Sequence, residues 1–305
     1  MNDIYQNCEN TFFRNGPYFH IYTTPPGNDL LFVSDADFKE ATNIIALAST
    51  GSGGKNLAYA IMSNHLHCLM AADRERCMAC IENLRRRIGA FLRRNGKRIP
   101  SIEFHIVEIS SLKQLRDEIA YIIRNPYTAR ADVNPFAYRW CTGYLYFNEM
   151  LKDIPAGTPA QEVPILVRRA IKHERNQEME PTLRILDGMI LPQSFVDYRL
   201  AMSLFENARQ FVWWVTRNVE AYTATAARLG ERKVLSDEEA YLVAITRSKA
   251  DFGVDKPSLL PLQQKNSLLR SLKYEYGANN KQLARCAGVP IGYINELFPL
   301  SAPIK

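Results

Sequence analysis

One apolar stretch, LAYAIMSNHLHCLMA at residues 57–71, constrains the fold of this chain more than any other. Its run of apolar residues predicts a central strand of a sheet. Only five histidines occur among the 305 residues, and two of them, His65 and His67, lie in this stretch. Side chains two positions apart in a strand share a face, so the two imidazoles are expected to project together.

A pair of imidazoles on an otherwise apolar face has two explanations. The histidines can be core residues whose polar atoms are hydrogen-bonded, which is the commoner case for an isolated His-x-His pattern. Alternatively, the spacing of His65 and His67 suits one metal ion bound through the imidazole nitrogens. A metal site would need a further ligand from another element.

The segments around this stretch alternate between strand and helix through residue 150. Ser34 is the expected N-cap of the first helix, with Asp37 in place of the usual capping-box glutamate. The last helix is expected to stop at Asn125-Pro126, because a residue before proline disfavours the α-helical conformation. The alternation predicts a sheet with helices on one face. The predicted strands are 17–24, 57–71 and 102–109, and the predicted helices are 35–48, 74–95 and 112–124.

The rest of the chain is predicted to be helical. Residues 153–157 begin a segment with several prolines and glycines that indicates a linker, and residues 161–265 are interpreted as helices throughout. Near the end of the chain, Ala284, Gly288 and Ile294 have the spacing of a helix-turn-helix. In that motif the small residue lets two helices cross closely, the glycine makes the turn and the β-branched residue anchors the second helix.

Composition and charge narrow the class of protein. The apolar fraction of 47% and the charged fraction of 23% are typical of a soluble globular protein. The six cysteines follow no disulfide spacing, which favours a reducing, cytoplasmic location. The chain shows no signal peptide at its start and no apolar run of about 18 residues, so neither secretion nor a membrane span is expected.

The net charge of +6 is unevenly distributed. The segment LRRRIGAFLRRNGKR at 84–98 carries seven basic residues and no acidic one. Such a segment can be a solvated helix face, but its charge density favours a surface that contacts the phosphates of a nucleic acid. The predicted nucleic-acid-binding residues are Arg85, Arg86, Arg87, Arg93, Arg94, Lys97 and Arg98.

The helix predicted at 112–124 can complete a metal site. Tyr121 and Asn125 are four residues apart, which places them on one face of a helix. Asn125 offers an amide oxygen, a ligand that Mg²⁺ or Mn²⁺ accepts, and Tyr121 offers a phenol within one turn of it. Taken alone, Tyr121 would be an ordinary tyrosine of an amphipathic helix.

These motifs together resemble a known family. MSNHLH at 62–67 is followed by a helix ending in YIIRNP at 121–126 and then by PFAYRW at 135–140. The combination resembles the single-tyrosine HUH transposases and, within them, the REP-associated tyrosine transposases, which typically read M-P-N-H-x-H, Y-I-x-x-N-P and P-x-x-Y-x-W. The resemblance covers residues 12–147. Ser63 stands where the family has proline, and the segment 94–105 is shorter than the family's.

The resemblance implies a role for each matching residue. His65 and His67 correspond to metal ligands, Asn125 to the third ligand and Tyr121 to the nucleophile. It implies Mg²⁺ or Mn²⁺ as the cofactor and single-stranded or hairpin DNA as the partner. The phenol, whose unperturbed pKa is about 10, would attack a phosphodiester and leave a 5′-phosphotyrosine and a free 3′-OH. Neither a membrane partner nor a small-molecule substrate is expected, and a homodimer is left open.

Alternatives remain open beside this interpretation. The chain can be a catalytically silent regulator that binds DNA through the helix-turn-helix and the basic helix, or a structural nucleic-acid-binding protein. His20 lies on a predicted strand, where core packing is at least as expected as a role near the site. Tyr138 and Trp140 can stack on bases or pack against the end of the helix.

The predicted fold class is α+β. A ferredoxin-like HUH domain, with an antiparallel sheet and helices on one face, is followed by an all-α C-terminal region with a helix-turn-helix. The predicted division is a single-tyrosine transposase-like catalytic domain at 1–150, a helical middle region at 151–265 and a helix-turn-helix DNA-binding segment at 266–305.

Overall fold

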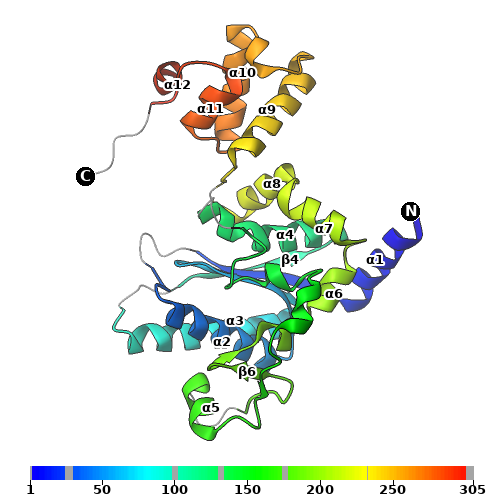
Figure 1. Ribbon diagram of the computed structural model, residues 1–305, viewed down its shortest axis with the longest axis vertical. Coiled ribbons are helices and arrows are strands. Elements are labelled where there is room, and N and C mark those ends of the chain that lie inside the picture. The colour runs from blue at the N-terminus through cyan, green and yellow to red at the C-terminus, as the bar shows by residue number, and fades with distance from the viewer. Residues whose placement is uncertain are drawn as a thin grey trace. The chain divides into compact units, whose positions relative to one another are not determined.

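The computed structural model describes residues 2–24, 30–97, 102–129, 134–173, 178–231 and 233–299. The chain divides into two compact units, residues 1–215 and 216–305 (Figure 1). The division predicted from the sequence has its boundaries elsewhere, at residues 150 and 265, because residues 151–215 pack with the sheet of the first unit.

A four-stranded sheet forms the centre of the first unit. The strands lie in the order β2-β3-β1-β4, and each neighbouring pair is antiparallel. The predicted α+β class with an antiparallel sheet is therefore confirmed. The strands are β1 at Tyr18–Thr23, β2 at Lys55–Ile61, β3 at Leu66–Ala71 and β4 at Phe104–Ile109.

The stretch 57–71 is not one strand, as the sequence predicted, but the greater part of a hairpin formed by β2 and β3. The backbone N–H of Met62 donates to the carbonyl of His65 at 2.8 Å and closes the turn. The carbonyl of Ser63 accepts from the backbone N–H groups of Leu31 and Phe32 at 2.7 and 2.9 Å. The turn is therefore held by a distant segment, and its own residues include neither glycine nor proline to mark it.

Helices α2 (Asp35–Gly51) and α3 (Arg74–Arg94) cover one face of the sheet (Figure 1). They bury the apolar side chains that project from this face of the sheet, such as Ile21, Cys68 and Met70. Helix α2 begins with the predicted capping box: the Ser34 hydroxyl accepts from the Asp37 backbone, and the Asp37 carboxylate accepts from the Ser34 backbone. This prediction is confirmed.

Further helices cover the opposite face, so the prediction of helices on one face is wrong. Helix α4 packs across β2 and β3, and α1, α6 and α7 complete this second core (Figure 1). All the residues of β1 and β3 are buried, as expected of strands covered on both faces. The helices are α1 at Asn2–Asn15, α4 at Leu112–Ala129, α6 at Tyr198–Ser203 and α7 at Ala208–Thr216.

Helix α4 continues through the predicted stop at Asn125-Pro126 and ends at Ala129. A proline inside a helix removes one backbone N–H, so the carbonyl of Ile122 loses its usual partner. The thiol of Cys141 lies 3.9 Å from that carbonyl oxygen and provides a weak donor in its place. Asn125 is consequently a residue of the helix itself.

The sequence predicted a helical middle region at 151–265. Residues 151–215 instead include a small three-stranded sheet. Asp187 and Gly188 connect β6 to β7 with positive φ angles of 50° and 73°, as a two-residue hairpin turn requires. Phe195 stacks on Tyr59 of the central sheet at 5.7 Å. The elements are η1 at Thr142–Leu145, η2 at Glu149–Asp153, β5 at Thr158–Pro159, α5 at Ile165–Lys172, β6 at Arg184–Leu186, β7 at Met189–Ile190 and η3 at Pro192–Ser194.

The second unit is helical. Helix α11 ends at Ala287 and is capped by Gly288, which has a φ of 61°. Three residues separate it from α12, in which Ile294 is buried. The Asn280 amide donates to Asn295 Oδ1 at 2.9 Å and to the carbonyl of Phe298 at 3.0 Å, which ties α11 to α12. The helices are α8 at Val219–Leu229, α9 at Asp237–Phe252, η4 at Pro257–Leu259, α10 at Leu262–Tyr274, α11 at Asn280–Ala287 and α12 at Ile291–Leu297.

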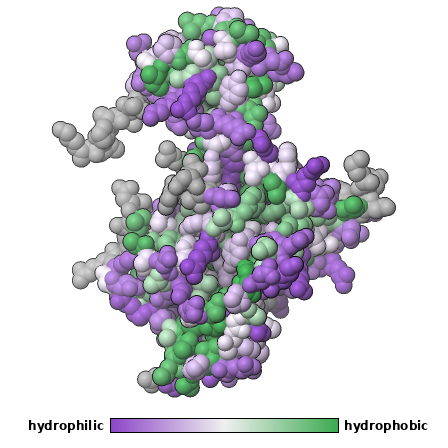
Figure 2. Space-filling model, in the orientation of Figure 1, coloured by the Kyte–Doolittle hydropathy of each residue, from purple (hydrophilic) through white to green (hydrophobic). Residues whose placement is uncertain are grey.

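The surface is mixed in polarity. Figure 2 shows polar and apolar side chains interspersed over the visible face, with an apolar area over α5, whose Ile165 and Leu166 are exposed. Among the described residues, we find no helix with the length and hydropathy needed to cross a membrane.

Candidate active site

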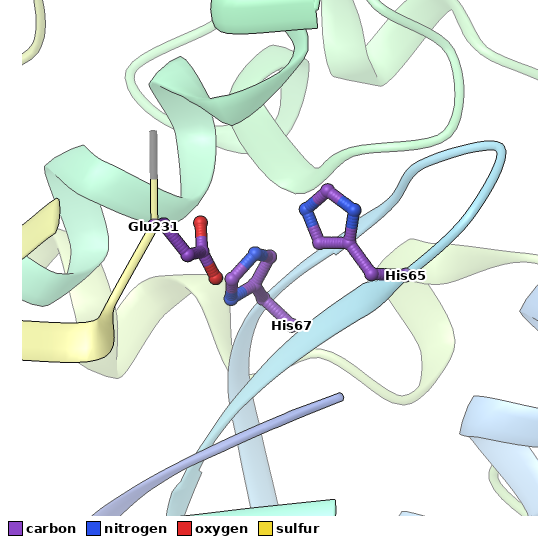
Figure 3. Close-up of side chains that lie close together, drawn as sticks. All are labelled: His65, His67 and Glu231. Carbon is purple, nitrogen blue, oxygen red and sulfur yellow. The ribbon is translucent and has the colours of Figure 1, made fainter. Parts of the chain in front are cut away.

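The β2–β3 hairpin brings the two histidines together. His65 lies in the turn and is partly exposed, whereas His67 lies on β3 and is buried between Tyr22 of β1 and Ala60 of β2. Figure 3 shows both rings turned toward the same space; their centroids are 5.0 Å apart and their planes are nearly perpendicular. One ring nitrogen of each lies within 4.8 Å of the other. Glu231, which Figure 3 also labels, is a residue of the second unit and is not counted among the residues of this site.

Helix α4 places Asn125 directly against both imidazoles. The Asn125 Nδ2 group lies 3.0 Å from His67 Nε2, and Asn125 Oδ1 lies 3.3 Å from His65 Nε2. The side-chain amide therefore bridges the two rings. The sequence predicted that Asn125 would face the histidine pair, and the structure brings these three residues together.

Tyr121 lies one turn earlier on the same face of α4. Its ring is 5.8 Å from the ring of His67, at an interplanar angle of 83°. The side chain is only 2% exposed. The phenol that the sequence suggested as a nucleophile is thus beside the histidine pair, but it is covered by the surrounding chain.

Two further buried residues extend the site inward. His20 on β1 approaches His67 with its Nε2 atom 3.0 Å from His67 Nδ1. The other ring nitrogen of His20, Nδ1, lies 2.7 Å from Glu118 Oε2 on α4. A line of polar contacts therefore runs from Glu118 through His20 and His67 to Asn125 and His65.

Burial sets the protonation of His67. Removal from water, reinforced by the neighbouring His65 and His20, holds the pKa of His67 well below its usual value of 6.5. A neutral imidazole keeps one nitrogen lone pair, which is the form that binds a metal ion.

Glu118 was not among the residues suggested by the sequence, and His20 was given core packing as an equal alternative. A signal for Glu118 was present, because residues 118, 121 and 125 share one face of a helix. The pairing of His20 with His67 depends on the register of β1 against β3, which no local pattern reveals.

The remaining aromatic and histidine candidates pack against their neighbours. The Tyr138 hydroxyl donates to the carbonyl of Ile61 at 3.0 Å, and buried Trp140 stacks on Phe38 at 5.4 Å. His105 lies on β4, where its ring stacks on Tyr22 at 4.9 Å.

The basic residues of α3 lie on the sheet face opposite to His67, because α3 packs against the core that α2 covers. Arg87 is buried, and its guanidinium donates to the carbonyl of Lys172 at 3.0 Å. Position 87 is three residues after Leu84 and four before Phe91, which places it on the apolar side of the helix. The prediction of Arg87 as a surface contact therefore needs correction, since its side chain is part of the core.

The other basic side chains of this segment mostly contact acidic or carbonyl groups. Arg85 pairs with Glu82, and Arg94 pairs with Glu40. Lys97 donates to the carbonyl of Leu31 at 2.8 Å. Arg86 donates to Asn83 Oδ1 at 2.9 Å, Arg93 is exposed, and Arg98 lies outside the described residues.

The residues that face the space between the rings are suited to a divalent cation. Two imidazole nitrogens and an amide oxygen form a donor set that Mn²⁺ or Mg²⁺ accepts, with imidazole favouring Mn²⁺. The distance of 3.3 Å from Asn125 Oδ1 to His65 Nε2 is close to the separation of about 3 Å between neighbouring ligands in an octahedral site with bonds of about 2.1 Å. Asn125 would have to turn its oxygen toward the ion.

Comparisons with known proteins give a distant structural likeness and no family. No protein-family model matches the chain, and no curated protein matches it. A solved structure of a REP-associated tyrosine transposase bound to a REP hairpin is similar over 43% of this chain and 78% of that chain, with 14% sequence identity and a TM-score of 0.33. This likeness is too weak to carry an argument about function.

Proposed function

We propose that this chain is a metal-dependent endonuclease and strand transferase that acts on single-stranded hairpin or repeat DNA. The observation that carries the proposal is the amide of Asn125 between the Nε2 atoms of His65 and His67. Two imidazoles and an amide in contact are more than core packing needs, and a tyrosine lies one helical turn away.

His65, His67 and Asn125 are the residues that would hold Mg²⁺ or Mn²⁺. When bound, such a cation supplies Lewis-acid polarisation of a phosphate and neutralises charge in the transition state. The protein contributes the fixed direction of the two rings. His67 is held within the sheet, and His65 by the hairpin turn.

Tyr121 is the proposed nucleophile. Its hydroxyl oxygen forms a bond to the phosphorus of a DNA phosphodiester as the bond from phosphorus to the 3′ oxygen breaks. The phenol loses its proton, the leaving 3′ oxygen gains one, and the products are a 5′-phosphotyrosine and a free 3′-OH. Attack by a 3′-OH on the phosphotyrosine reverses these changes, so joining needs no external energy source. Because Tyr121 is 2% exposed, the proposal requires DNA binding to open access to its ring.

The topology of the first unit supports a ferredoxin-like HUH domain as its fold. The chain order β1-α2-β2-β3-α3-β4 with the sheet order β2-β3-β1-β4 is the arrangement such a domain requires. The turn at Gly288 between α11 and α12, with Ile294 buried, supports the helix-turn-helix as a DNA-binding element.

Basic residues on α3 are proposed to add phosphate contacts. Arg85, Arg86 and Arg93 are exposed, and Arg94 and Lys97 lie nearby with their present partners. They lie on the far face of the sheet from His67, so they would hold DNA at a distance from the scissile phosphate rather than at it.

A DNA-binding regulator without cleavage activity is the second candidate. The burial of Tyr121 favours it, since a covered phenol cannot attack a phosphodiester. A test for a covalent protein–DNA adduct separates the two candidates, because a regulator binds hairpin DNA without forming a covalent bond to it.

The direct test is to incubate the full chain with single-stranded hairpin DNA and Mn²⁺ and to look for a protein–DNA adduct on a denaturing gel. We expect an adduct with the natural chain, and none with Tyr121→Phe or with His67→Ala. Tyr127→Phe is the matched control, because it removes a phenol from the same helix at a position where the ring lies under Arg124. An adduct that persists in Tyr121→Phe would contradict the proposal.

A further inference from the structure

Three buried ionisable side chains stand in line behind the proposed metal site. Glu118 on α4, His20 on β1 and His67 on β3 are each 0% exposed. Glu118 Oε2 is 2.7 Å from His20 Nδ1, and His20 Nε2 is 3.0 Å from His67 Nδ1. Placing three such groups out of water is costly unless their hydrogen bonds compensate, so the line is a specific arrangement.

The order of donors and acceptors along this line fixes the tautomer of each ring when His20 carries a single proton. A carboxylate only accepts hydrogen bonds, so Glu118 requires a proton on His20 Nδ1. A neutral His20 then has an unprotonated Nε2, which can only accept from a proton on His67 Nδ1. The Nε2 atom of neutral His67 is therefore left with its lone pair on the side of the ring that Asn125 of α4 contacts.

Asn125 provides independent support for this assignment. Its Nδ2 group is a donor and lies 3.0 Å from His67 Nε2, so that nitrogen is an acceptor. Two contacts made by different elements, β1 on one side and α4 on the other, thus require the same tautomer of His67.

We propose that Glu118 and His20 are positioning residues that hold His67 in the Nδ1–H tautomer, with Nε2 presented to a divalent cation. The inference rests on the proposed function and adds two residues to it. Neither Glu118 nor His20 touches the cation or the DNA; both act through His67. Partners that orient a metal-binding imidazole in this way typically change metal affinity by about 10- to 100-fold when they are removed.

His65 has a different form of support. Its Nδ1 atom lies 2.7 Å from Oδ1 of the adjacent Asn64, and the ring is partly exposed. The two proposed ligands are therefore unequal: His67 is fixed by a buried line that spans three elements, whereas His65 depends on its own turn. Loss of the buried line should weaken the site through His67 alone.

The first measurement needs no metal. Nitrogen-15 NMR of the five histidine side chains of the full chain reports which ring nitrogen of each carries the proton. We expect His67 in the Nδ1–H form in the natural chain, and a shift toward the Nε2–H form in His20→Phe and in Glu118→Met. His67 found in the Nε2–H form in the natural chain would overturn the inference.

The second measurement is the affinity for Mn²⁺, followed by electron paramagnetic resonance of the free ion. We expect Mn²⁺ binding to weaken about 10- to 100-fold in His20→Phe and in Glu118→Met, and His20→Gln to recover part of the loss because its amide oxygen can accept from His67. Asp117→Asn is the matched control: it removes the neighbouring carboxylate of α4, which contacts Lys113 and Trp214 instead.

The outcomes separate the two levels of the proposal. Unchanged Mn²⁺ affinity in both His20→Phe and Glu118→Met would overturn the positioning role and leave the proposed function standing. A natural chain that binds no Mn²⁺ would overturn the proposed function and the positioning role together. If His20→Phe fails to fold, Glu118→Met and the spectrum of the natural chain still decide the question.

Discussion

At the scale of single residues, Asn125 determines how the site is held together. Its amide contacts both imidazoles, and it does so from a helix that continues past a proline. Without this side chain, His67 Nε2 would lose its hydrogen-bond donor inside the core. A buried polar atom left in that state costs about 1–3 kcal/mol.

We therefore expect Asn125→Ala to weaken Mn²⁺ binding by at least about tenfold and to lower the free energy of unfolding of the metal-free protein by about 1–3 kcal/mol. Titration with Mn²⁺ and chemical denaturation measure the two effects. Asn83→Ala on the exposed side of α3 is the control. Equal Mn²⁺ affinity in the natural chain and in Asn125→Ala would remove Asn125 from the site.

The lowered pKa of His67 predicts how stability depends on pH. In the unfolded chain His67 takes up a proton as the pH falls below about 6.5, whereas in the metal-free folded protein it stays neutral to lower pH. The unfolded state then binds more protons, so the free energy of unfolding decreases as the pH falls from 6.5 toward the folded pKa.

We expect His67→Gln to lose less of its own stability than the natural chain does between pH 7 and pH 5, because this source of proton uptake is gone. Urea denaturation in the presence of a chelator measures the difference. His105→Gln, on β4 of the same sheet and partly exposed, serves as the control. Parallel curves for the natural chain and His67→Gln would show that the buried imidazole does not titrate on unfolding.

At the scale of elements, local signals predicted helices α2, α3 and α4 and strands β1 and β4. Helix α3 was predicted within one residue, because its apolar positions repeat at helical spacing between Asp73 and Asn95. The capping box marked the start of α2. The turn between β2 and β3 was missed because its backbone is held by Leu31 and Phe32, far away in the sequence.

The capping box of α2 can be tested on its own. We expect Ser34→Ala to lower the free energy of unfolding by about 1 kcal/mol, because the hydroxyl that accepts from the Asp37 N–H is removed. Thermal or urea denaturation measures the change. Ser203→Ala, which removes an exposed hydroxyl that donates to the carbonyl of Leu200 within its own helix, should change stability less.

The sequence spacing of the site residues predicted only which residues share one side of the same element. His65 and His67 were two apart and Tyr121 and Asn125 four apart, so each pair could be placed on one side of its own element. The approach of α4 to the hairpin was expected from a family resemblance rather than from any local pattern. Glu118 was missed and the role of His20 was left open, because their contact depends on how a helix packs over a strand 98 residues earlier in the chain.

At the scale of the whole molecule, the central sheet is covered on both faces: all of β3 and all of β2 except Lys55 are buried. The alternation of strands and helices had suggested helices on one face only. Covering both faces separates the exposed basic residues of α3 from His67, which faces α4. The exposed basic residues of α3 and the proposed metal site therefore lie on opposite faces of one sheet.

We expect the affinity for a DNA hairpin to fall as salt rises, with a slope set by the number of phosphates contacted. In the triple variant Arg85→Gln, Arg86→Gln, Arg93→Gln, the negative slope of log K against log salt should become shallower by about 2 to 3. The control is Arg14→Gln, Lys152→Gln, Arg169→Gln, which removes the same charge from exposed positions elsewhere in the first unit. Equal slopes in the two triple variants would show that α3 does not contact DNA.

The central claim is that the phenol beside the histidine pair forms a covalent bond to DNA. Peptide mass spectrometry of the nuclease-trimmed adduct identifies the bonded residue, since the tryptic peptide DEIAYIIR at 117–124 contains a single tyrosine. We expect this peptide to carry a nucleotide phosphate on Tyr121 after incubation with hairpin DNA and Mn²⁺. A modification found on any other residue, or an unmodified 117–124 peptide in an adduct that has formed, would contradict it.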